Sequence, residues 1–176
     1  MVGRESDKQK LQRALERNKA QIVVVYGRRR VGKTFLINEF FNNSFAFKHT
    51  AVSPIEKGSA KGLLQNQLAE FFYSMKSYGL SSVETCPKTW IEAFHLLQEL
   101  MDHKADGNNQ VIFIDELPWM DTPRSGFVSA FEHFCNDWCS ARSHVKLIVC
   151  GSATSWICDE MLDSKGGLYD RVTTSI

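Results

Sequence analysis

One stretch near the N-terminus, Gln21–Phe41, limits the fold of this chain more than any other part of it. It starts with the apolar run QIVVVY, passes through the cationic, glycine-framed turn GRRRVGKT and ends with FLINEFF. A short apolar run rich in valine is typical of a buried strand, and the last segment has the apolar spacing of an amphipathic helix. A buried strand that leads through such a turn into a helix indicates a phosphate-binding unit.

The turn Gly27–Thr34 matches the pattern G-x-x-x-x-G-K-S/T. Backbone N–H groups at a helix N-terminus hold polyphosphate, and glycines allow the chain to wrap closely around it. In this pattern Lys33 contacts the β- and γ-phosphates, and the Thr34 hydroxyl coordinates Mg²⁺. A solvated basic turn is the alternative interpretation, and the spacing argues against it. The residues predicted to bind the nucleotide here are Gly27, Arg28, Arg29, Arg30, Val31, Gly32, Lys33, Thr34 and Phe35.

The arginines of the turn, Arg28, Arg29 and Arg30, are not required by that geometry. Two interpretations are open: they form the exposed part of the loop, or they contact DNA or a partner subunit. The formal net charge of the whole chain is +1, so any basic surface must be local. This arginine cluster is therefore the one feature of the sequence that supports DNA binding.

The run VIFIDELPWM, Val111–Met120, predicts the second half of the site. Its apolar residues lead to Asp115 at a strand end, the acidic position that holds Mg²⁺ in nucleotide-hydrolysing proteins with this loop. Because the chain turns there, Glu116 can face an attacking water, orient it and accept its proton. The alternative is that the two acids cap a loop. The sequence has no Asn-Lys-x-Asp element to bind guanine, and ATP hydrolysis fits this acid pair best.

The run LIVCGSATSW, Leu147–Trp156, is a third buried strand that ends in polar residues. If it lies between the other two strands, a polar side chain at its end lies close to the γ-phosphate and can sense it. Ser152 is the first candidate and Thr154 the second. Either could also cap the following helix, a role that does not exclude sensing. Arg171, in LYDRV, is the last candidate, as an arginine finger for a neighbouring subunit or as a surface salt bridge.

Along the whole chain, apolar runs alternate with segments of helical period, which predicts a parallel sheet wrapped by helices. The predicted strands are Ile22–Tyr26, Phe45–Ala51, Val111–Asp115 and Val145–Cys150. The predicted helices are Lys8–Asn18, Gly32–Phe41, Lys61–Tyr78, Thr89–Lys104, Ser125–Ser140 and Thr154–Leu162. The 176 residues suffice for one domain, and the last residues resemble the start of another strand. We therefore expect residues 1–176 to be the core domain of a longer protein.

Composition limits the environment of the protein. No apolar run approaches the length of a membrane span, and the N-terminus MVGRESDKQK lacks the apolar core of a signal peptide. We expect a cytoplasmic location and no membrane contact. The five cysteines lack the spacing of a secreted disulfide scaffold. Cys135 and Cys139 would share a helical face, and without a second Cys or His pair core packing is favoured over zinc binding.

Taken in order, several segments resemble the archaeal-type ATPase family, in the AAA+/STAND branch of the P-loop ATPases. These segments are Val2-Gly3-Arg4-Glu5, VVYGRRRVGKT, VIFIDELPW, LIVCGSATSW and GLYDR. The resemblance implies a three-layer αβα sandwich whose parallel sheet has the order 5-1-4-3-2, with the Gly151 strand between those of Gly27 and Asp115. It implies that Val2, Gly3 and Arg4 lie near the adenine. It also puts Arg171 where AAA+ proteins have a finger arginine.

The same resemblance implies a larger protein, because family members continue into a helical lid, often a winged helix and frequently a nuclease-like domain. The predicted function is Mg²⁺-dependent ATP binding and hydrolysis that drives a conformational change in that protein. The predicted catalytic residues are Lys33, Glu116, Ser152 and Arg171, and the predicted Mg²⁺ ligands are Thr34 and Asp115. One alternative is an ATP-binding regulatory switch or scaffold with slow or no hydrolysis. Another is a DNA-associated partner of a nuclease, and the full-length form is a candidate homo-oligomer.

Overall fold

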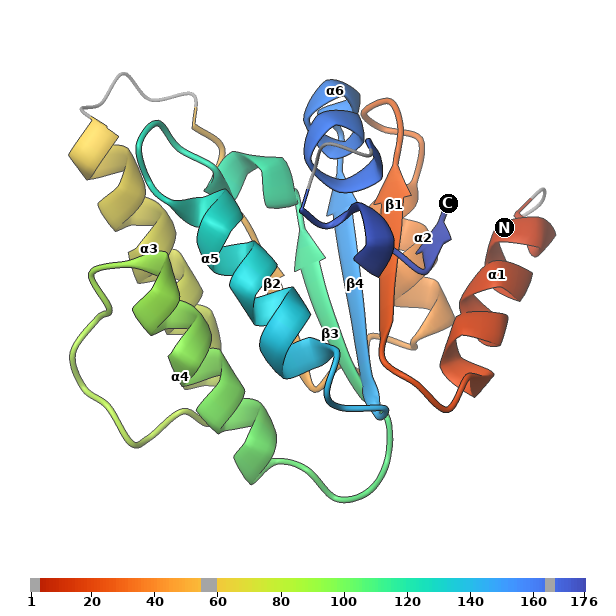
Figure 1. Ribbon diagram of the computed structural model, residues 1–176, viewed down its shortest axis with the longest axis horizontal. Coiled ribbons are helices and arrows are strands. Elements are labelled where there is room, and N and C mark those ends of the chain that lie inside the picture. Colours follow the sequence, from red (N-terminus) through yellow and green to blue (C-terminus); the bar gives the residue numbers. More distant parts are fainter. Residues whose placement is uncertain (1–3, 55–59, 164–166) are drawn as a thin grey trace.

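The computed structural model describes residues 4–54, 60–163 and 167–176 (Figure 1). Within these residues, five strands form one parallel sheet in the order β2-β3-β4-β1-β5. The strands are β1 (Gln21–Tyr26), β2 (Phe47–Thr50), β3 (Gln110–Asp115), β4 (Val145–Gly151) and β5 (Thr174–Ser175). The predicted sheet order is confirmed, including the position of β4 between β1 and β3.

Helices connect these strands in the described part of the chain. The α-helices are α1 (Glu5–Glu16), α2 (Lys33–Phe40), α3 (Ala60–Ser77), α4 (Trp90–His103), α5 (Phe127–His133) and α6 (Thr154–Ile157). The 3₁₀ turns are η1 (Leu117–Met120) and η4 (Tyr169–Arg171), and the π-helical segments are η2 (Phe134–Cys139) and η3 (Cys158–Leu162).

The helices lie on both faces of the sheet, which confirms the three-layer architecture. Figure 1 shows α2 behind the sheet and α5 in front of it. Alternate residues of β1 point to opposite faces: Val23 and Val25 pack with α1 and α2, whereas Ile22 and Val24 belong to the larger core under α3, α4 and α5. That larger core contains a run of aromatic rings, with Phe94 in contact with Trp90, Phe127, Phe131 and Phe134.

Two predicted helices differ from the structure in their internal geometry. The predicted helix Ser125–Ser140 begins at Phe127 and changes to π geometry after His133, where the Ser140 N–H donates to the Cys135 carbonyl at 3.1 Å. The predicted helix that starts at Thr154 changes in the same way at Cys158. The spacing of apolar residues could not predict these changes, because a π segment keeps the same broad face buried while it shifts the hydrogen bonds by one residue.

The cysteines of η2 lie in the core. Cys135 and Cys139 are both buried, which agrees with the packing interpretation. Burial, together with the adjacent Cys139 thiol, raises the pKa of the Cys135 thiol well above its usual value. No group of three or more His, Cys, Asp or Glu side chains is arranged to hold a metal ion among the residues that the structure describes. None of the described helices combines the length and apolar character that a membrane crossing requires.

Candidate functional site

The parallel register brings the ends of three strands to one edge of the sheet. Tyr26 of β1 pairs with Gly151 of β4, and Ile114 of β3 pairs with Val149 of β4. The segments that follow these strands, the phosphate loop Gly27–Thr34, the Asp115–Glu116 pair and Ser152, therefore begin side by side. The family resemblance implied this convergence, since it placed β4 between β1 and β3, and the observed strand order agrees.

The phosphate loop needs glycine at both of its ends for conformational reasons. Gly27 has φ 135° and Gly32 has φ 81°, values that residues with a side chain rarely adopt. Gly32 is the residue that precedes α2, and the Leu36 N–H donates to its carbonyl at 2.9 Å. The predicted phosphate-binding turn therefore leads directly into a helix N-terminus, where N–H groups are available to an anion.

Lys33 lies over its own loop and is only 6% exposed. Its ammonium group donates to the carbonyls of Gly27 at 2.9 Å and Arg28 at 2.8 Å. A buried ammonium needs such partners, because its desolvation would otherwise be costly. Two backbone oxygens of the same loop thus hold the cation in place.

Thr34 and Asp115 join the phosphate loop to the end of β3. The Thr34 hydroxyl donates to Asp115 Oδ2 at 2.8 Å, and the Glu116 N–H donates to Asp115 Oδ1 at 3.0 Å. Asp115 is buried. Burial, and then the negative charge of Asp115, raise the pKa of the Cys150 thiol, so this neighbour stays protonated. A carboxylate and a hydroxyl side by side are oxygen ligands of the kind that Mg²⁺ prefers.

Glu116 adopts an uncommon backbone conformation and points toward the end of β4. Its φ and ψ are 52° and 42°, in the left-handed region, immediately before the turn η1. One of its carboxylate oxygens, Oε2, accepts hydrogen bonds from the Ser152 N–H at 3.2 Å and the Ser152 hydroxyl at 2.9 Å. Ser152, the first candidate for the γ-phosphate sensor, is therefore hydrogen-bonded to Glu116, the residue that follows β3.

The capping interpretation of Ser152 and Thr154 is wrong. Helix α6 begins after Ala153, which caps it without a side-chain hydrogen bond. Thr154 is exposed and is the first residue of that helix. The Ser152 hydroxyl bonds to Glu116 instead, because the chain bends at Ser152 toward the β3 end before α6 starts.

The remaining residues of the loop are accessible to solvent. Arg28, Arg29 and Arg30 are exposed, which is compatible with both of their interpretations. The Arg29 guanidinium lies 5.3 Å from the centre of the Trp119 ring, a cation–π contact between the phosphate loop and η1. Sequence reasoning missed this contact, since nothing in the spacing of the two residues signals it.

The predicted adenine-side residues are only partly described. The Arg4 guanidinium donates to the Val31 carbonyl, so it contacts the phosphate loop. Val31 and Phe35 are 43% and 57% exposed. Val2 and Gly3, which were predicted to lie near the adenine, are outside the described residues.

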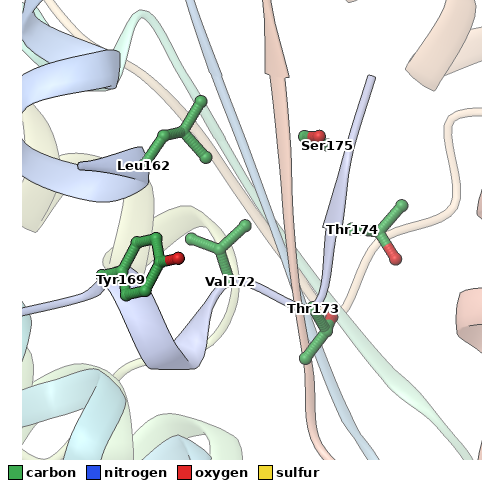
Figure 2. Close-up of a pocket in the computed structure, with 6 residues that line it drawn as sticks. All are labelled: Leu162, Tyr169, Val172, Thr173, Thr174 and Ser175. Carbon is green, nitrogen blue, oxygen red and sulfur yellow. The ribbon is translucent and has the colours of Figure 1, made fainter. Parts of the chain in front are cut away.

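Arg171 is not part of this constellation within one chain. It is exposed in η4, and its N–H donates to the Leu168 carbonyl at 2.9 Å. Across residues 4–54, 60–163 and 167–176, no hydrogen bond or ion pair joins it to the phosphate loop. Figure 2 shows the surface hollow beside η4, which has a volume of about 440 Å³. The hollow is lined by Leu162, Tyr169, Val172, Thr173, Thr174 and Ser175.

Comparison with known proteins gives one family and several similar chains. Residues 1–176 match a protein family that is described as an ATPase domain predominantly from Archaea. An uncharacterised protein of Methanocaldococcus jannaschii is 27% identical over 172 residues, which are 98% of this chain and 34% of that protein. An uncharacterised ATP-binding protein of the same organism is 48% identical over 42 residues, 24% of this chain and 71% of its own length.

Two solved structures have the same fold. A Walker-type ATPase of Pyrococcus abyssi superposes with a TM-score of 0.62 and 19% identity, over 100% of this chain and 53% of its own. Cdc6p of Pyrobaculum aerophilum superposes with a TM-score of 0.60 and 15% identity, over 98% of this chain and 45% of its own. The chain thus spans about a third to a half of the length of these relatives, apart from the short local match.

Proposed function

The chain belongs to the family of ATPase domains found predominantly in Archaea and has the fold of the P-loop ATPases, and from this premise we propose that it binds ATP with Mg²⁺ and hydrolyses it to ADP and phosphate. The family and the fold already make it a nucleotide-binding, ATPase-like module. The observation that carries the finer proposal is the 2.8 Å hydrogen bond between Thr34 and Asp115. It unites the phosphate loop with an acidic strand end that carries a second acid beside it.

Nucleotide binding would use the loop and its cation. Lys33 exchanges the carbonyls of Gly27 and Arg28 for phosphate oxygens, so that a neutral acceptor is replaced by an anionic one. Thr34 and Asp115 would hold Mg²⁺, which supplies neutralisation of the phosphate charge when it is bound. Arg4, Val31 and Phe35 are the described residues that we assign to the base side of the nucleotide.

Hydrolysis would depend on Glu116. We assign it to orient a water molecule and accept its proton, while Ser152 holds the carboxylate through two donors. We also assign Ser152 to sense the γ-phosphate, because it is attached to the middle strand of the site. Arg171 as an arginine finger for a second subunit stays a prediction, and so do homo-oligomers and a contact between Arg28–Arg30 and DNA.

A slowly hydrolysing or non-hydrolysing regulatory switch is the second candidate, and one observation favours it. The charged groups of the site already have partners inside the protein: Lys33 has loop carbonyls, Asp115 has Thr34, and Glu116 has Ser152. Turnover requires that these bonds open. In either case we propose that the nucleotide state is read by further parts of a longer protein, as the greater length of the relatives suggests.

The test is steady-state phosphate release from ATP with and without Mg²⁺, compared with nucleotide binding. Glu116→Gln removes the base and keeps the shape of the side chain. We expect it to lower phosphate release at least about tenfold and to leave ADP affinity within about threefold of the wild type. Undiminished release in this variant would rule out Glu116 as the base. Tight nucleotide binding with no release by the wild type would favour the switch.

A further inference from the structure

Gly151 has no space for a side chain, although its backbone could accommodate one. Unlike Gly27 and Gly32, it does not have a positive φ. A Cβ atom on Gly151 would lie 2.7 Å from Pro118 Cδ and 2.9 Å from Pro118 Cγ. Carbon atoms in contact prefer roughly 3.5–4.0 Å, so even one methyl group here requires that something moves.

The obstacle is rigid. Pro118 is buried within η1, and its ring is closed onto the backbone, so it cannot rotate aside as the end of a long side chain would. Relief of the contact must therefore move the backbone of η1 or the end of β4. The third neighbour, Ile157 Cδ1 at 3.3 Å, is the flexible end of a side chain and matters less.

The two segments that meet here, η1 and the end of β4, adjoin the two partners of the hydrogen bond between Glu116 and Ser152. Glu116 immediately precedes η1, and Ser152 immediately follows Gly151. The bonds from the Ser152 N–H and hydroxyl to Glu116 Oε2, at 3.2 Å and 2.9 Å, thus lie next to the Gly151–Pro118 contact. Glu116 also has a left-handed backbone, which persists in a residue with a side chain only where the surroundings hold it.

We propose that Gly151 is a positioning residue: by lacking a side chain it lets Pro118 pack against the end of β4, and this contact sets the distance at which Glu116 meets Ser152. This inference rests on the proposed function for its catalytic consequence, because Glu116 is the assigned base. Its structural part concerns the nucleotide-free protein alone.

The test compares Gly151→Ala, the double variant Gly151→Ala/Pro118→Ala and a matched control. In the control, Gly167→Ala, the new Cβ meets the Glu132 carboxylate, the end of a flexible side chain that can move away. Gly167 is exposed and lies outside the assigned site. We expect the control to behave as the wild type does, and the double variant to regain much of what Gly151→Ala loses, because it removes the ring that obstructs the methyl group.

The first measurement is amide hydrogen exchange followed by NMR in the nucleotide-free protein. In Gly151→Ala the Ser152 amide should exchange at least about tenfold faster, while the Val149 amide, inside the sheet, keeps its rate. General destabilisation would accelerate both amides. The second measurement is ATP turnover, where we expect kcat to fall at least about tenfold with KM within about threefold.

The exchange and turnover results test the positioning inference and the proposed function separately. Wild-type exchange at Ser152 in Gly151→Ala overturns the positioning inference, and so does a double variant that recovers neither exchange protection nor kcat. If Gly151→Ala does not fold, recovery of a folded, protected double variant supports the inference and its failure overturns it. Absent hydrolysis by the wild type, or full activity of Glu116→Gln, contradicts the proposed function instead and leaves the exchange result to decide the contact.

Discussion

Acid should destabilise this domain through His49, a residue of β2 on the side of the larger core. The side chain is 2% exposed, and its ring lies 5.0 Å from that of Phe71. The Ser74 hydroxyl donates to the Glu70 carbonyl at 3.0 Å, so its oxygen accepts the bond from His49 Nδ1–H at 2.8 Å. Nε2 is then the unprotonated nitrogen, and it is buried without a hydrogen-bond partner among the described residues. Burial lowers the pKa of His49 from 6.5 to about 4.

The direction of the pH effect on stability depends on whether the folded or the unfolded state binds the proton of His49 more tightly. With a folded-state pKa below the unfolded value, the unfolded chain takes up the proton first, so stability is complete above pH 6.5 and falls as the pH drops toward 4. With these two pKa values, the free energy of unfolding falls by about 2 kcal/mol between about pH 7 and about pH 5. The loss reaches about 3 kcal/mol near pH 4.

Urea denaturation of the wild type and His49→Leu at both pH values isolates this contribution. The variant lacks the titrating group, so the difference in unfolding free energy between the two proteins should shift by about 2 kcal/mol in favour of the variant on acidification. His95→Gln is the matched control, because it removes a histidine from an exposed position of α4. A shift below about 0.5 kcal/mol for His49→Leu would refute the assignment of the pH dependence to this burial.

Three further outcomes are expected. Lys33→Ala should weaken ADP binding at least about tenfold by isothermal titration calorimetry, because it removes the cation of the loop, and unchanged affinity would contradict the assigned binding mode. Phe94→Ala should lower the free energy of unfolding by about 3–5 kcal/mol in urea, whereas Tyr73→Ala, at a side chain that is 66% exposed, should change it by less than about 0.5 kcal/mol. Arg29→Ala should change the fluorescence of Trp119 in the nucleotide-free protein, since the guanidinium faces that ring, and an identical spectrum would deny this contact in solution.

Much of the fold could be predicted from local pattern and family resemblance. Valine- and isoleucine-rich runs predicted β1, β3 and β4 to within a residue at each end. Their order in the sheet came from the resemblance and not from periodicity, because a local pattern contains no information about which strands become neighbours. The turn η1 was missed, although Pro118 near its start is a signal that such a turn can use.

The proximity of two site residues was predictable from their motifs. The phosphate-loop pattern and the acid at the end of β3 predicted that Thr34 and Asp115 approach each other, and they do so at 2.8 Å. The contact of Arg29 with Trp119 and the absence of space at Gly151 were not predictable, because both depend on how η1 folds back over the strand ends. Such contacts arise from tertiary packing and leave no periodic trace in the sequence.

The internal pairing of Lys33, Asp115 and Glu116 has a consequence for biosynthesis. Because Lys33 and Asp115 are buried and already hydrogen-bonded within the protein, neither needs an external ion to offset its desolvation, so the newly made domain can fold before any ligand binds. Folding of the domain therefore does not require a bound ligand, and a nucleotide that arrives later meets side chains that are already in place.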